Sequence, residues 1–406
     1  MYYPGSTGWI EKYFELIETN QVQLIKKNNT LVDLSRDSGL IYGVAVNTIF
    51  SSNTLQANWT SKDKLKNLFF ETLLWTHWTN SDFQFDKELF IADLASYYSS
   101  IKPKNSFDFL SFFKKESAIS SIESAIEERL ELDKRFLETR IWLNTLNNAF
   151  VFLDVILFQE FLQTKKIRPL QSLAEKAVHC FIEAVHSDKE ITEIEEKLFS
   201  FYIASSRLEK ENDEQLENQF QNPFLELNLE QLLSESEDFK LFLIYLSAFV
   251  FSCKSEISKE EKSFLVTLCD SFNFSDELAE IALAFSTAFV LENAKLIPYL
   301  GSSTEILLSN LSNRWGKILL RNKDKLVLEI QQSKELMFLL AKSTQKELTK
   351  EEKEVVKNQL MDIIRSMPSL AIFLIPGGSL LLPVFLKIIP GLMPSAFRDN
   401  EVNKDI

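Results

Sequence analysis

Residues 366–386 read Ser-Met-Pro-Ser-Leu-Ala-Ile-Phe-Leu-Ile-Pro-Gly-Gly-Ser-Leu-Leu-Leu-Pro-Val-Phe-Leu and include no charged side chain. An uncharged run of this length can cross the hydrocarbon core of a bilayer as a helix. Prolines break a helix in water, but a membrane tolerates them where neighbouring groups satisfy the freed carbonyls. The sequence therefore predicts a membrane segment over 367–394, either a single pass or a re-entrant hairpin. Its characteristic residues are Pro368, Pro376, Gly377, Gly378, Pro383, Lys387, Pro390 and Pro394.

The same stretch has a second interpretation, as a broken apolar segment packed inside a soluble protein. Within the apolar segment, Lys387 is the sole ionisable group, near the end predicted to face outward, where a long side chain can reach the interface. A single pass without an acid or base at mid-membrane cannot conduct protons alone. Ion exchange by this segment would therefore need an oligomer or the carbonyls freed by the prolines.

Several short motifs of this segment resemble the membrane segment of the LETM family, the leucine-zipper/EF-hand transmembrane proteins of mitochondria and their bacterial relatives. The motifs are Phe373-Leu-Ile-Pro376, Leu381-Leu-Pro383-Val, Lys387, Pro390 and Pro394-Ser-Ala-Phe397. The resemblance covers roughly 350–397. It implies ribosome binding and cation/proton exchange, and one bacterial branch of the family is described as biofilm-associated.

Glycine is scarce in the chain: nine residues in all, with none from Val44 to Leu300. Sheet proteins need glycine in their hairpin turns. A stretch of this length without glycine therefore predicts an all-α fold, a multi-helix soluble body followed by the proline-rich segment.

Charge is unevenly distributed. The net charge is −14, yet residues 314–365 carry twelve Lys/Arg against eight Asp/Glu. Basic residues next to a membrane segment stay on the cytoplasmic side and attract anionic headgroups. We therefore expect a bacterial inner-membrane protein whose N-terminal body is cytoplasmic. The residues expected to contact lipid or a partner are Arg314, Lys317, Arg321, Lys323 and Lys325.

A solvated helix face is the alternative interpretation of these five cations. Binding to RNA phosphates would use the same residue types. Residues 1–313 are strongly acidic, however, which argues against sequence-specific recognition of nucleic acid.

The middle of the chain contains a weak internal repeat, in which Phe181–Phe199 aligns with Ala248–Leu265. Each copy carries a capping box, Thr192-x-x-Glu195 and Ser258-x-x-Glu261, and Thr349-x-x-Glu352 is a third. The repeated unit is similar to that of TerB-like tellurite-resistance domains. The predicted organisation is a helical domain over 1–168, a TerB-like region over 169–297, basic helices over 298–366, the membrane segment over 367–394 and a tail over 395–406.

Two further segments carry structural predictions. Apolar spacing over 117–164 predicts one long helix or a closely joined pair. The apolar run 149–158 is too short to span a bilayer and contains Asp154, so we expect it to be a buried core helix. The acidic, Gln/Asn-rich stretch 209–222 predicts an exposed loop.

No catalytic motif is visible. The sequence has no phosphate-binding glycine loop, no GxSxG elbow and no paired Cys and His nucleophile. His179 and His186 are seven residues apart with Asp188 close by, but a metal site needs further ligands. The sequence therefore favours a protein that is not an enzyme and has no cofactor and no metal.

Three functions remain open. The favoured one is a membrane-anchored interaction protein that binds a protein partner or the ribosome. The second is an oligomeric component of cation/proton exchange, and the third is a soluble helical scaffold.

Overall fold

The computed structural model describes residues 2–27, 29–50, 59–101, 115–138, 140–222, 232–254, 256–293, 316–317, 319–343, 346–365, 386 and 389. The chain divides into two compact units, residues 1–250 and 251–406. This division falls inside the region 169–297, and the domain boundaries expected from the sequence stay predictions.

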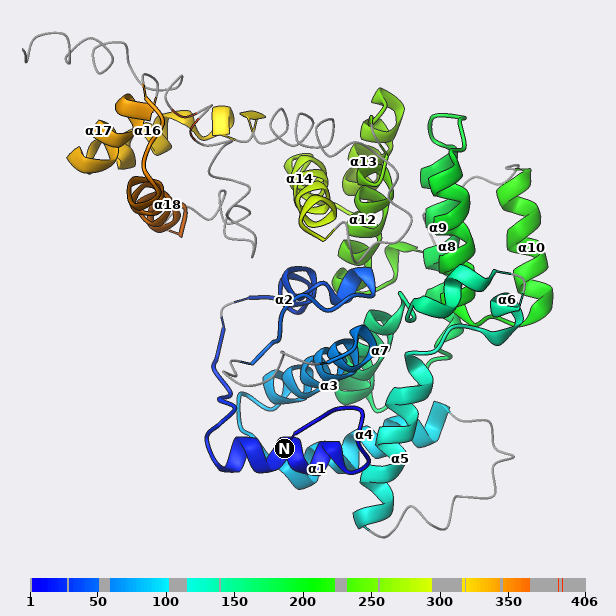
Figure 1. Cartoon of the computed structure of the whole chain (residues 1–406). Coiled ribbons are helices and arrows are strands. Elements are labelled where there is room, and N and C mark those ends of the chain that lie inside the picture. The colour runs from blue at the N-terminus through cyan, green and yellow to red at the C-terminus, as the bar shows by residue number, and fades with distance from the viewer. Residues whose placement is uncertain are drawn as a thin grey trace, which may run out of the picture. The chain divides into compact units, whose positions relative to one another are not determined.

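The described residues form helices and no β-strand, which confirms the all-α expectation for this part of the chain. Figure 1 shows the helices in chain order. The first unit contains α1 (Trp9–Glu18), α2 (Leu31–Ser38), η1 (Leu40–Tyr42), α3 (Ser61–Asn80), α4 (Lys87–Ile101), α5 (Lys115–Arg129), α6 (Lys134–Leu137), η3 (Ile141–Thr145), α7 (Val151–Thr164), α8 (Gln171–His186), α9 (Glu193–Ser206), α10 (Lys210–Gln221) and most of α12 (Glu237–Ser252). The second contains α13 (Lys259–Ser271), α14 (Glu277–Glu292), α16 (Lys323–Gln331), α17 (Lys334–Ser343) and α18 (Lys350–Arg365).

Helix α3 is the centre of the first unit. Fifteen of its 20 residues are buried, so it has no solvent-facing stripe of ordinary width. It packs against α7, which lies beside it in Figure 1, and also against α2 and α5. Phe70 of this helix is met edge-on by the rings of Trp9, Tyr13 and Phe90. Such aromatic pairs add to the burial of apolar area that stabilises the core.

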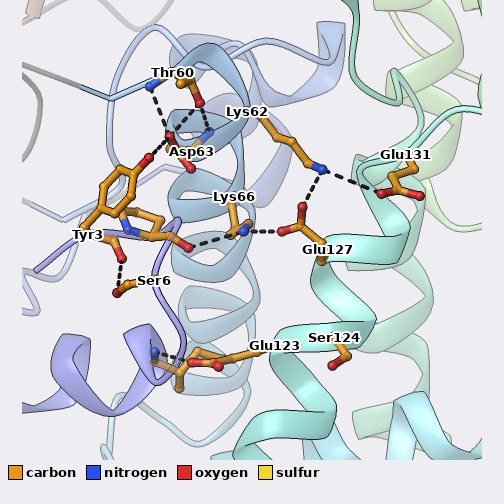
Figure 2. A network of polar contacts seen from close by, with 12 residues as sticks. Tyr3, Ser6, Thr60, Lys62, Asp63, Lys66, Glu123, Ser124, Glu127 and Glu131 are labelled. Atoms are coloured by element: carbon orange, nitrogen blue, oxygen red, sulfur yellow. Dashed lines mark hydrogen bonds and ion pairs between the residues drawn. The ribbon is translucent and has the colours of Figure 1, made fainter. Parts of the chain in front are cut away.

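A polar network fastens the N-terminal residues to α3 and α5 (Figure 2). The Tyr3 hydroxyl donates to Asp63 Oδ2 at 2.9 Å, and Lys66 Nζ donates to the Pro4 carbonyl at 3.2 Å. Glu123 of α5 accepts from the backbone N–H of Gly8 and of Ile10, both at 3.0 Å. This carboxylate satisfies N–H groups at the start of α1 that have no partner within the helix.

The predicted capping boxes are confirmed at Thr192–Glu195 and Ser258–Glu261. Each hydroxyl accepts from the backbone N–H three residues on, and each glutamate accepts from the cap. A further capping box opens α3, where Thr60 is the N-cap and Asp63 accepts from its backbone N–H. Helices α8–α9 and α12–α13 thus each form a helix, turn and capped helix, whereas the TerB-like resemblance stays a prediction.

The prediction of one long helix or a closely joined pair over 117–164 is wrong in both forms. Helix α5 ends at Arg129, and α7 begins only at Val151. Between them the backbone folds back, since Asn148 N–H donates to the Leu130 carbonyl at 2.9 Å and Asp133 caps the short α6. The apolar spacing was misleading because Ile141 is 76% exposed. The predicted core helix around Asp154 is confirmed, as α7 is buried along most of its length.

The expected exposed loop over 209–222 is also wrong, because this stretch contains α10. Leu216 and Phe220, four residues apart, share one face of α10 and are buried. The Phe220 ring stacks on Phe199 of α9 with 4.0 Å between centroids. Two apolar residues at helical spacing outweigh the polar composition of the remaining positions.

Candidate functional site

Helices α16, α17 and α18 pack against one another in the second unit. Apolar residues three and four apart place one stripe of each helix toward the others. The buried residues of this group are Leu326, Ile330, Leu336, Leu339, Leu340, Leu348, Val356 and Leu360. The group therefore has a small apolar core of its own.

Polar contacts fix α18 against α17. Ser333 Oγ donates to Gln359 Oε1, and Gln359 Nε2 donates to Glu335, both at 2.6 Å. Lys342 Nζ lies 2.6 Å from Glu352 Oε1, and this hydrogen bond lowers the pKa of the Glu352 carboxyl. Glu352 also accepts from the Thr349 backbone N–H at 3.0 Å. The third capping box is thus present at the start of α18, as the sequence predicts.

Four lysines lie in α18 and just before it: Lys346 precedes the helix, and Lys350, Lys353 and Lys357 belong to it. Within α18, steps of three and four residues keep the last three side chains near one line. Lys353 is 2.7 Å from Glu347 and Lys357 is 3.9 Å from Glu354, with about a third of each lysine side chain exposed. We call these four residues the lysine stripe. Sequence inspection missed it, although the three-and-four spacing is visible in the sequence.

The five cations predicted to contact lipid or a partner fall before and within α16. Lys317, Arg321, Lys323 and Lys325 are exposed, and Arg314 lies outside the described residues. Lys317 Nζ is 3.7 Å from Glu280 of α14, with 58% of the lysine side chain exposed. The structure therefore brings four of the five onto one stretch of the chain surface, whereas their binding role stays a prediction.

The predicted membrane segment lies outside the described residues. This applies to Pro368, Pro376, Gly377, Gly378, Pro383, Lys387, Pro390 and Pro394. Among the helices that the structure describes, none combines the length and the apolar character that a membrane crossing requires.

The histidines singled out in the sequence lie on α8. His186 Nε2 is 2.9 Å from the Phe220 carbonyl oxygen, and burial lowers the pKa of His179. In the described ranges, no three His, Cys, Asp or Glu side chains come close enough to hold a metal ion.

Comparison with known proteins finds one family match, in the C-terminal part of the chain. Residues 348–405 match the family model "LETM1-like, RBD", where RBD denotes a ribosome-binding domain. The match begins just before α18 and includes Lys350, Lys353 and Lys357 of the lysine stripe. No curated protein and no solved structure matches the chain. The LETM-like resemblance found in the sequence is therefore confirmed for residues 348–405, whereas the biofilm-associated branch stays a prediction.

Proposed function

We propose that this protein is a helical adaptor that binds the ribosome through its LETM-like part and is tethered to a membrane by residues 366–386. The observation that carries the ribosome-binding half is the match of residues 348–405 to the LETM1-like ribosome-binding domain. The first unit, with its thick apolar core around α3, supplies a folded body for the tether to hold.

The lysine stripe is the ribosome contact in this proposal. Ribosomal RNA presents a dense row of phosphates, and each lysine that neutralises a phosphate releases condensed counterions. Lys350, Lys353 and Lys357 lie within the matched residues and beside the buried stripe of α18, which includes Val356 and Leu360. The buried stripe holds α18 to α17, so the lysines are presented from a fixed support.

Reversing the charge of the lysine stripe is expected to weaken ribosome binding. In the variant K350E/K353E/K357E the affinity should fall at least tenfold at low salt, and the slope of log K against log salt should drop by about 3, one per lost phosphate contact. Sedimentation of the full chain with bacterial ribosomes through a sucrose cushion, at several salt concentrations, measures both quantities.

The matched control is K166E/K189E/K210E, which changes the net charge equally at three exposed lysines of the first unit. It should keep the salt slope of the unchanged protein. Binding that stays equal in the stripe variant and the unchanged protein would contradict the proposal. A loss of affinity without a change in the salt slope would indicate that the lysine stripe contacts a ribosomal protein rather than ribosomal RNA.

The membrane tether rests on the sequence of residues 366–386, which has the length and the absence of charge that a bilayer requires. We expect the full chain to stay with membranes after carbonate washing, and a variant lacking residues 367–406 to move to the supernatant. A full chain recovered wholly in the carbonate supernatant would remove the tether from the proposal. It would leave the lysine-stripe experiment unaffected, because that experiment uses no membrane.

A further inference from the structure

Large apolar side chains are exposed at an unusual density just before and within α16 and α17. Ten such side chains are exposed among the described residues, and three of them lie within 316–343: Leu320 at 57%, Leu328 at 62% and Phe338 at 55%. The same stretch carries six Lys/Arg against three Asp/Glu. Single exposed leucines are ordinary on protein surfaces, but apolar residues set among cations are typical of a surface that binds something.

The exposed residues lie opposite the buried ones. Residues 316–317 and 319–321 are helical, a turn follows at residue 322, and α16 then runs to Gln331. Leu319 is buried in the first piece, and Leu326 and Ile330, four residues apart, share the buried side of α16. The opposite side carries the apolar–basic face, which we define as Lys317, Leu320, Arg321, Lys325 and Leu328.

We propose that the apolar–basic face rests on the surface of a bilayer that contains anionic lipid. Its cations meet the headgroups, while Leu320 and Leu328 enter the boundary between headgroups and acyl chains. This inference deepens the proposed function, because a tether that begins at residue 366 would hold this part of the chain near the bilayer. The contact differs from the tether, as it concerns the surface of the membrane rather than its interior.

Charge and apolarity together favour a bilayer over RNA. Phosphates of RNA attract the three cations but gain nothing from two leucines, and the face presents no aromatic ring on which a base could stack. An anionic bilayer uses both residue types at once. Two acids lie near this face, Asp324 within the stretch and Glu280 of α14, 3.7 Å from Lys317 Nζ, so the three cations exceed the acids by one.

The test is a nitroxide label at Leu328→Cys in the full chain, reconstituted into liposomes of phosphatidylcholine alone or with phosphatidylglycerol. Collision with oxygen reports the bilayer, and collision with a water-soluble nickel chelate reports water. We expect the label to gain oxygen access and lose nickel access in the anionic liposomes. The charge-reversal pair Arg321→Glu and Lys325→Glu should weaken this contact on the order of 30-fold, since each cation near such a surface contributes about 1 kcal/mol.

The matched control is a label at Leu233→Cys, where the leucine is 44% exposed in the first unit. Cys180, Cys253 and Cys269 are all buried, so the nitroxide reagent should react only with the introduced cysteine. A label at residue 328 that stays in water while the protein resists carbonate washing would overturn the inference and leave the tether standing. A label at residue 233 that enters the bilayer equally, or a label at residue 328 shielded by ribosomes and not by liposomes, would also overturn it.

The same experiments distinguish a failure of the membrane tether from a failure of the surface contact. If carbonate removes the protein, yet the label at residue 328 still enters anionic liposomes and the charge-reversal pair releases it, the surface contact stands and the tether falls. If the full chain associates with neither kind of liposome, both fall.

Discussion

Replacing Asp154 by alanine is expected to destabilise the first unit by about 3–5 kcal/mol, the range found when one member of a buried ion pair is removed. The Asp154 side chain is fully buried, and the Arg129 side chain is 15% exposed. Arg129 Nε and Nη2 donate to the two carboxylate oxygens at 2.7 and 3.2 Å. The alanine variant would leave the largely buried Arg129 guanidinium without its counter-charge.

Urea unfolding of the full chain, followed by tryptophan fluorescence, measures this change. Five of the six tryptophans lie in residues 1–250, so the signal reports mainly on the first unit. Two comparisons isolate the cause. Arg129→Met with Asp154→Leu should restore most of the stability, because apolar groups of similar size replace both charges.

The second comparison is Glu193→Ala, which removes the exposed pair with Lys197 at 2.6 Å and should change stability far less, because water screens this pair. An Asp154→Ala variant that is no less stable than Glu193→Ala would contradict our account. The two pairs have similar distances, so burial decides the difference between them.

The fold class could be predicted from the sequence because it depends on a property of the whole chain. Tight hairpin turns need glycine, and glycine is scarce along the whole chain, so β-hairpins are disfavoured throughout. Capping boxes were also predictable, since Thr192 and Glu195 act over three residues with no help from the rest of the fold. The short apolar run around Asp154 correctly predicted that α7 is a core helix. The ion pair of Asp154 with Arg129, 25 residues away, could not be predicted from residue spacing.

Element boundaries were less predictable because tertiary contacts decide them. The break after Arg129 depends on Asn148 reaching the Leu130 carbonyl, which no periodicity encodes. Helix α10 depends on Phe220 stacking on a ring of another helix. At the candidate site, the exposed cations before and within α16 were evident from charge, whereas the apolar–basic face required knowing that Leu320 and Leu328 point away from the core.

Glu71 is another buried acid of the first unit, and four neutral groups donate hydrogen bonds to it. Its carboxylate accepts from the Tyr13 hydroxyl at 3.0 Å and from Asn67 Nδ2 at 2.9 Å. It also accepts from the backbone N–H of Ile49 at 2.7 Å and of Phe50 at 3.3 Å. Burial raises the pKa of this carboxyl to about 7, and the four donors offset only part of that rise.

The raised pKa makes the stability of the first unit depend on pH. Below about pH 4.5 Glu71 is protonated in both the folded and the unfolded chain, so its contribution is then constant. Between pH 4.5 and 7 the unfolded chain loses this proton while the folded chain keeps it, and folding becomes less favourable as the pH rises. The loss amounts to roughly 3 kcal/mol by pH 8, at about 1.4 kcal/mol per pH unit.

We therefore expect the difference in unfolding free energy between the unchanged protein and Glu71→Gln to shift by roughly this amount between pH 5 and pH 8, in the direction that disfavours glutamate at pH 8. All other titrating groups are shared and cancel in the difference. Urea unfolding of both proteins at the two pH values gives the result, and Glu15→Gln at an exposed position of α1 is the matched control. A difference that is the same at both pH values would show that Glu71 is already ionised at pH 5. The four donors would then outweigh burial, and Glu71 would act as a permanently charged bridge between α3 and the backbone at Ile49.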